Sequence, residues 1–167
     1  MVAGASAGGA LTAAVSLMAR DRQGPKISYQ ALMIPVTDDR LRTPSHRDAA
    51  DADGFNKASN EGMWLHYLGP NYDRNNTSAY AAPLRADNFS NLPPAFVQTN
   101  GLDPLRDEGL EYAMALLEAG VEVEIYNCPG AYHGAPPKDV RTADIAFRVY
   151  NAALGAHLNP EAPTATI

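Results

Sequence analysis

The sequence predicts an α/β fold built on a mostly parallel sheet of about four strands, with helices on both faces. Three observations support this prediction. Short apolar runs that end at Gly or Pro alternate with longer segments of helical periodicity, which is typical of strands joined by right-handed crossovers. A Ser flanked by glycines stands where the first strand gives way to the first helix. Finally, 167 residues with 46% apolar side chains suffice for one domain with a buried core.

The first element is a small apolar run that leads into Gly4-Ala5-Ser6-Ala7-Gly8. This Gly-x-Ser-x-Gly pattern is typical of a nucleophile elbow, a strained strand-to-helix turn that holds the Ser clear of its neighbours. We expect a side chain at either Gly4 or Gly8 to collide with the turn. The pattern also occurs in plain tight packing, so the motif alone leaves both interpretations open.

A helix is predicted over residues 10–20, directly after this turn. Its Leu11, Val15 and Met18 recur at spacings of four and three, which predicts the stripe that packs on the sheet. The N-terminus of the helix would direct free N–H groups and a partial positive charge at Ser6, which suits a developing oxyanion.

The next strand is predicted over residues 27–34, a mostly apolar run stopped by Pro35. The regular pattern then breaks up over residues 36–94, where only residues 57–68 have helical spacing. Long excursions between strands are where α/β proteins place lids and pocket walls, so we expect a lid-like insertion here.

Order resumes with a strand over residues 95–100 and a helix over residues 105–119, which begins after Asp-Pro and ends at Gly. A further strand is predicted over residues 121–127, closed by Pro-Gly, and a last helix over residues 138–157. Each strand is therefore followed by a helix, as the fold class requires.

Composition excludes several classes of function. A net charge of −6 without a basic run disfavours nucleic acid and anionic membranes as partners, and no uncharged apolar stretch is long enough to span a bilayer. The lone Cys128 and the lack of a signal-like start indicate a cytoplasmic protein. No His, Cys or carboxylate pair has metal-ligand spacing, and no phosphate-binding loop occurs, so we expect no metal and no cofactor.

A nucleophilic Ser needs a base within reach and a carboxylate that orients the base. Functional groups of open α/β sheets lie at the carboxyl ends of strands. Asp103 follows the 95–100 strand and His133 follows the 121–127 strand. The order Ser6, Asp103, His133 is the chain order of the α/β-hydrolase triad.

Each of these residues has an alternative role. Asp103 could simply cap the 105–119 helix. Asp107 and Glu108 fit the first turn of that helix, where the helix dipole stabilises their charge, so they are weaker candidates for the acid. The remaining histidines lie in the excursion or at a helix end and are interpreted as structural: His46, His66 and His157.

The chain resembles the C-terminal half to two thirds of esterases of the α/β-hydrolase fold-3 family, the bacterial hormone-sensitive-lipase-like group. Four stretches carry the resemblance over nearly the whole length: residues 4–9 with 19–22, residues 29–35, residues 92–95 leading to 103–109, and residues 126–134.

The resemblance implies a partial α/β-hydrolase domain over residues 1–158, followed by a disordered tail over 159–167. It assigns the triad to Ser6, Asp103 and His133, and one oxyanion donor to the N–H of Ala7. A small-molecule ester is the implied substrate, and no cofactor is needed. The residues expected to line its pocket are Val36, Thr37, Tyr132 and Trp64.

The family also carries a His-Gly-Gly-Gly segment upstream of the nucleophile, which supplies most of the oxyanion hole, and residues 1–167 do not include it. We therefore expect an N-terminally truncated domain whose first strand is an open sheet edge, through which a homo-oligomer could form. Three functions stay open: a serine carboxylic ester hydrolase acting through an acyl-enzyme, a catalytically impaired relative acting by interaction, and a peptidase or amidase with the same triad.

Overall fold

The computed structural model describes residues 1–49, 52, 54–135 and 139–158, so the tail expected over 159–167 lies outside the described residues. Its strands form one four-stranded parallel sheet in the order β1-β2-β3-β4, which confirms the predicted fold class. The strands are β1 (Val2–Ala5), β2 (Gln30–Met33), β3 (Ala95–Asn100) and β4 (Val123–Cys128).

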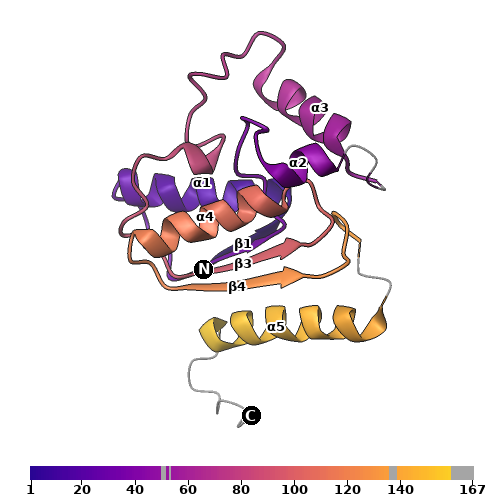
Figure 1. Ribbon diagram of the computed structural model, residues 1–167. Helices are drawn as coiled ribbons and strands as arrows, with labels where there is room; N and C mark the ends of the chain where they lie inside the picture. The colour runs from indigo at the N-terminus through magenta and orange to yellow at the C-terminus, as the bar shows by residue number, and fades with distance from the viewer. Residues whose placement is uncertain (50–51, 53, 136–138, 159–167) are drawn as a thin grey trace.

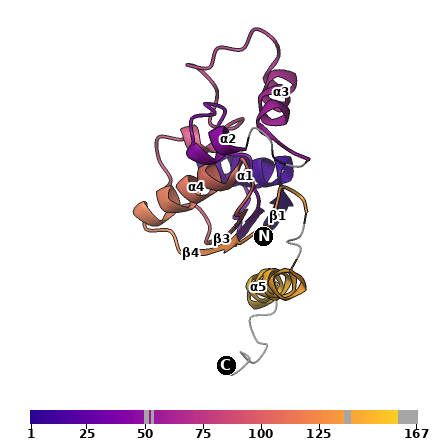
Figure 2. The same cartoon turned by 45° about the vertical axis from the view of Figure 1, so that its right-hand side comes forward.

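Helices cover both faces of the sheet, as Figure 1 shows. Helices α1 (Ala7–Asp21) and α4 (Arg106–Glu118) lie on one face, and α5 (Val140–Leu158) lies on the other. The excursion between β2 and β3 holds α2 (Pro44–Asp48), α3 (Lys57–Leu68) and the 3₁₀ turn η1 (Pro83–Arg85). In the turned view of Figure 2, α2 and α3 again lie beyond α1 and α4, on the side away from α5.

The two central strands are largely buried because helices cover them from both sides. Ala95, Phe96 and Val97 of β3 are all at most 1% exposed. Strand β2 is shorter than the predicted 27–34 run. It ends at Met33 because the next residue, Ile34, takes a positive φ of 41°, which is incompatible with a strand.

The predicted packing stripe of α1 is wrong. Leu11 is 57% exposed and Val15 is 44% exposed. The buried stripe instead consists of small side chains at helical spacing, with a single large one at its end: Gly9, Thr12, Ala13, Ser16 and Leu17. Small residues let the helix approach the sheet closely, so side-chain size outweighed hydrophobicity in choosing the face.

Two apolar clusters hold the layers together. The larger one lies between the sheet and the α1 and α4 layer and includes Leu17, Leu32, Val97, Tyr112 and Leu116. The smaller one joins the sheet to α5 and consists of Tyr29, Ala31, Phe96 and Ala153 with partly buried neighbours. The α1 and α4 face therefore carries most of the buried apolar surface that positions the strand ends.

Buried polar groups, rather than a large apolar core, anchor the excursion to α4. Glu108 is 1% exposed and accepts hydrogen bonds from the backbone N–H groups of Thr37 (2.7 Å) and Asp38 (3.2 Å). Asp107 accepts from the N–H of Ser45 at 2.7 Å. The first-turn acids of α4 thus do more than complement the helix dipole, because they fix the segment that follows β2.

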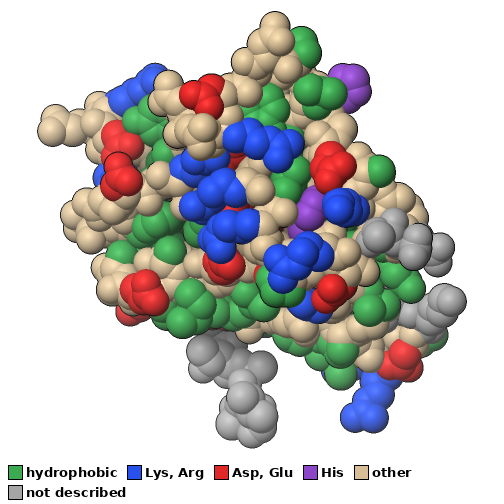
Figure 3. Space-filling model, turned by 45° about the horizontal axis from the view of Figure 1, so that its top comes forward, with side chains coloured by type: hydrophobic (Ala, Val, Ile, Leu, Met, Phe, Trp, Pro, Cys, Tyr) green, Lys and Arg blue, Asp and Glu red, His purple; other side chains and the backbone are tan. Residues whose placement is uncertain are grey.

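Charged side chains on the excursion side of the molecule are largely paired. Figure 3 shows Lys and Arg side chains gathered on this face with acidic side chains among them. Ion pairs join Arg40 to Asp38 and Arg106 to Asp107. Within the described ranges, none of the helices is both long and apolar enough to cross a bilayer.

Candidate active site

Ser6 occupies the turn between β1 and α1 in a strained conformation. Its φ of 55° and ψ of −119° lie in a region that non-Gly residues rarely adopt. Its N–H donates to the carbonyl of Met33 at 2.9 Å, so the turn remains tied to β2. A Cβ at Gly4 would lie 2.2 Å from the carbonyl oxygen of Gly8, which explains the glycine two residues before the Ser. These features are those of a nucleophile elbow.

The expectation for Gly8 is wrong, because a Cβ there would meet no atom within 4 Å. The closely packed glycine is instead Gly9, whose Cβ would lie 2.9 Å from Cα of Pro35. The start of α1 therefore needs glycine where it crosses the loop after β2, not at the second Gly of the motif.

The other two predicted residues meet Ser6 at the same edge of the sheet. His133 lies in the turn after β4, with Nε2 2.8 Å from the Ser6 hydroxyl oxygen. Its Nδ1 lies 2.7 Å from Oδ2 of Asp103, in the loop after β3. The Asp103 side chain is 1% exposed and that of His133 is 10% exposed. With its proton on Nδ1, the imidazole donates to Asp103 and accepts from Ser6.

Asp103 contacts both the imidazole and the backbone before α4, but it does not cap this helix, whose cap residue is Leu105 and receives no side-chain hydrogen bond. While Oδ2 contacts the imidazole, Oδ1 accepts from the N–H of Leu105 at 2.8 Å, immediately before α4. The loop that carries His133 is fixed as well, because the side chain of Asn100 donates to the carbonyl of Tyr132 at 2.7 Å. Asp103 is thus held by a neighbouring backbone N–H, and the loop that carries His133 is held by the side chain of Asn100.

The N–H predicted to donate to the oxyanion lies at the start of α1. Ala7 is the first residue of α1, and within the described part of the chain its N–H meets no hydrogen-bond acceptor. The carbonyl of Ser6 accepts from the N–H of Val36 at 3.3 Å and from that of Ala10 at 3.1 Å. These bonds fix the turn, and the N–H groups of the first turn of a helix have no partner within the helix.

An apolar cavity of about 170 Å³ opens beside Ala7. Two of the expected pocket residues line it, Val36 and Trp64, together with Leu11, Met63, Tyr67 and others. The exposed Leu11 of α1 thus forms cavity wall rather than core.

The other two expected pocket residues do not line this cavity. Thr37 is fully buried and its hydroxyl donates to the carbonyl of Glu108 at 2.9 Å. Tyr132 lines a separate depression that also includes Asp103. Thr37 therefore supports the excursion. A position just after a strand does not show whether a residue lines the apolar cavity.

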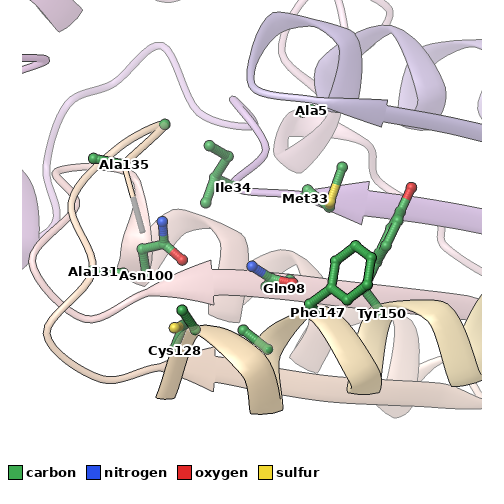
Figure 4. A pocket seen from close by; sticks show the side chains of 13 residues that line it. Ala5, Met33, Ile34, Gln98, Asn100, Cys128, Ala131, Ala135, Phe147 and Tyr150 are labelled. Carbon is green, nitrogen blue, oxygen red and sulfur yellow. The ribbon is translucent and has the colours of Figure 1, made fainter. Parts of the chain in front are cut away.

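A second cavity, of about 290 Å³, lies between the carboxyl ends of the strands and α5 (Figure 4). Ala5, which precedes the Ser, and Gly134, which follows the His, both belong to its lining. Phe147 and Tyr150 of α5 close it from below. The Ser6 and His133 pair is therefore flanked by one cavity on the Ala7 side and one on the Ala5 side.

The structure also reveals two residues near Ser6, His133 and Asp103 whose contacts the sequence does not indicate. The ring of Phe55, just before α3, lies 4.4 Å from that of His133, centroid to centroid. Glu108 is buried against the loop after β2, and this burial raises its pKa well above the usual glutamate range. In a sequence, a buried acid in the first turn of a helix looks the same as an exposed one. An isolated Phe in an irregular segment likewise has no pattern that indicates its contacts.

The remaining histidines lie apart from this constellation. His46 is buried beside Asn60, with Nδ1 3.2 Å from the amide nitrogen, and burial lowers its pKa. His157 stacks on Tyr29 at a centroid distance of 3.5 Å. Burial raises the pKa of the Cys128 thiol. In the described ranges, no three His, Cys, Asp or Glu side chains are arranged to hold a metal ion.

Comparison with known proteins gives a match to the alpha/beta hydrolase fold and relatives that are esterases. A family model described as alpha/beta hydrolase fold matches residues 1–136. Esterase LipI of Mycobacterium tuberculosis is 41% identical over 133 residues, which cover 80% of this chain and 41% of that protein. Carboxylesterase NlhH of the same organism is 39% identical over 135 residues, covering 80% of this chain and 42% of that protein.

Solved structures that resemble this chain also include esterases. Esterase LipW from Mycobacterium marinum superimposes with a TM-score of 0.85 at 33% identity, covering 95% of this chain and 49% of that one. A bacterial heroin esterase gives a TM-score of 0.78 at 40% identity, with coverages of 93% and 48%. The chain thus spans somewhat less than half the length of these proteins.

Proposed function

Because the chain belongs to the alpha/beta hydrolase family, we propose that it is a serine carboxylic ester hydrolase that acts on small acyl esters. The observation that carries the proposal is the hydrogen-bonded series from Ser6 through His133 to Asp103, with distances of 2.8 and 2.7 Å. The names of the esterase relatives support the same class of reaction.

The proposed reaction is a two-step acyl transfer. The Ser6 hydroxyl oxygen attacks the ester carbonyl carbon while Nε2 of His133 takes its proton. Asp103 keeps the imidazole in the productive tautomer and stabilises the imidazolium, and the N–H of Ala7 donates to the oxyanion. His133 then protonates the leaving alkoxide, which departs as the alcohol and leaves Ser6 acylated. Water, deprotonated by His133, attacks the acyl-enzyme, and His133 returns the proton to the Ser6 oxygen as the carboxylic acid is released.

The cavities indicate the size of the substrate. The cavity beside Ala7 has a volume of about 170 Å³ and is lined almost wholly by apolar side chains. A cavity of ~150 Å³ holds a benzene molecule, so this one accommodates a short or compact apolar group. The cavity on the Ala5 side provides space for the other part of the ester. We therefore propose short-chain esters as the substrate class.

Other aspects of function stay predictions from the sequence. They comprise the absence of nucleic-acid and membrane partners, the cytoplasmic location, and oligomer formation through β1, which lies at one edge of the sheet. An amidase or peptidase activity would use the same three residues, and the experiment below separates it from esterase activity.

The test is a substrate series with wild-type chain and Ser6→Ala. We expect hydrolysis of p-nitrophenyl acetate and butyrate, a fall in kcat/KM for longer acyl chains, and little turnover of an aminoacyl p-nitroanilide. Ser6→Ala should reduce kcat by about 10⁶-fold while the melting temperature stays unchanged. Equal hydrolysis by both proteins would refute the proposal, and faster turnover of the amide would replace it with the amidase alternative.

A further inference from the structure

The excursion places an aromatic ring against the imidazole of His133. The centroids of the Phe55 and His133 rings are 4.4 Å apart, and the ring planes are inclined by 34°. The imidazole is otherwise held by two hydrogen bonds that lie in its own plane, to Ser6 and to Asp103. In-plane bonds resist sliding of the ring better than tilting out of the plane. A ring packed over one face supplies the missing restraint.

Phe55 is itself held in place from both sides. It packs on an apolar cluster formed by Val36, Trp64, Ala82 and Leu105. The following residue, Asn56, caps α3 by accepting from the N–H of Ser59 at 3.0 Å. The preceding Gly54 has a φ of 77°, a conformation that glycine adopts without strain. The ring therefore lies directly before the capped start of α3.

This placement has an electrostatic consequence for the proposed reaction. His133 becomes an imidazolium each time it takes the proton of Ser6 or of water. An aromatic face within ~6 Å of a cation attracts it, most strongly where water is excluded. At 4.4 Å, with the His133 side chain only 10% exposed, the Phe55 ring meets both conditions.

We propose that Phe55 is a positioning residue, whose ring fixes the His133 imidazole between Ser6 and Asp103 and stabilises its charged form during acyl transfer. The proposal rests on the proposed esterase function and deepens it, since it assigns to the excursion a role in the chemistry besides forming a cavity wall. Phe55 touches His133 and not the substrate cavity, whose lining does not include it.

The test compares Phe55→Leu, Phe55→Tyr and the matched control Phe89→Leu. Phe89 is also a partly buried phenylalanine, packed edge-on against Tyr112 at 5.7 Å and remote from the triad. Leu keeps much of the apolar volume but has no aromatic face, whereas Tyr keeps the face. Steady-state kinetics on p-nitrophenyl acetate and melting temperatures would be measured for all four proteins.

We expect Phe55→Leu to lower kcat by about 2- to 30-fold with KM within twofold of the wild type. Phe55→Tyr and Phe89→Leu should keep the wild-type kcat. An unchanged kcat in Phe55→Leu, a rise in KM alone, or a loss in Phe89→Leu as large as in Phe55→Leu would overturn the proposal. So would a kcat of Phe55→Tyr as low as that of Phe55→Leu.

A second readout does not depend on catalysis. The ring current of Phe55 should shift the ring-proton NMR signals of His133 upfield, and Phe55→Leu should abolish the shift. If the wild-type chain hydrolyses no ester, the esterase proposal fails while this measurement still decides the contact. Identical His133 signals in wild type and Phe55→Leu would refute the positioning role whatever the activity.

Discussion

Two regions of the molecule are held in place by different kinds of interaction. One is the framework, formed by the sheet, α1 and α4, and the other is the excursion over residues 36–94. The framework positions Ser6, Asp103 and His133 through strand ends, a strained turn and one continuous apolar cluster. The excursion is tied down by buried polar groups such as Glu108 and by a small apolar cluster around Trp64. The comparison teaches that the positions of Ser6, Asp103 and His133 depend mainly on backbone geometry, whereas the pocket wall and the Phe55 ring depend on a few side-chain anchors.

The largest effect should come from breaking the framework at the acid. Asp103→Asn keeps an oxygen for the N–H of Leu105, but its amide N–H group faces Nδ1 of His133 and holds the imidazole in the wrong tautomer. In a triad the corresponding change lowers kcat by ~10⁴-fold, a value taken from the serine protease template. Steady-state kinetics with circular dichroism as a check of folding would measure it. A fall in kcat of less than tenfold in a folded variant would show that Asp103 is not the acid that orients His133.

The two motif glycines offer a sharper test of the same framework. Gly4→Ala would place a Cβ 2.2 Å from the Gly8 carbonyl oxygen and must displace the elbow, which we expect to lower kcat/KM by about 10²-fold or more. Gly8→Ala meets no atom within 4 Å and gains helix propensity, so its activity should stay within about twofold and its melting temperature should not fall. Equal damage from both substitutions would contradict the account of the turn.

The anchor between the two regions should give a smaller effect, on stability and on KM. Glu108→Ala leaves the buried N–H groups of Thr37 and Asp38 without their acceptor, at a cost of about 1–3 kcal/mol each. Because the excursion forms the cavity wall, KM should rise more than kcat falls. Glu108→Gln retains an acceptor oxygen and should keep the wild-type stability and KM. Denaturant unfolding and substrate kinetics on the two variants separate these outcomes.

Glu108 also predicts a dependence of stability on pH. Burial raises its pKa in the folded state well above the usual value of ~4.3, so the folded chain binds the proton more tightly than the unfolded chain. Its stabilising contribution is therefore complete below the unfolded pKa and is lost as pH rises toward the folded one. The melting temperature of Glu108→Gln relative to wild type should increase with pH. A difference that is constant from pH 4 to pH 9 would be inconsistent with this assignment.

The sequence alone predicts the framework better than it predicts the excursion. Strand and turn patterns are local. The sequence therefore predicts the parallel sheet, the turn at Ser6, and the strands that Asp103 and His133 follow. The packed face of α1 was mispredicted because close helix packing selected small residues over Leu11 and Val15. The contacts of Glu108 and Phe55 were missed because they join residues about 70–80 positions apart in the chain, which no periodicity encodes.

The central claim is that Ser6 is a nucleophile activated by the neighbouring imidazole. Reaction with a fluorophosphonate, followed by mass-spectrometric mapping, tests it without requiring knowledge of the substrate. We predict a single modified residue, Ser6, with no modification in Ser6→Ala and a labelling rate at least tenfold lower in His133→Gln. A folded wild-type chain that stays unlabelled, or one labelled at another serine, would contradict the account.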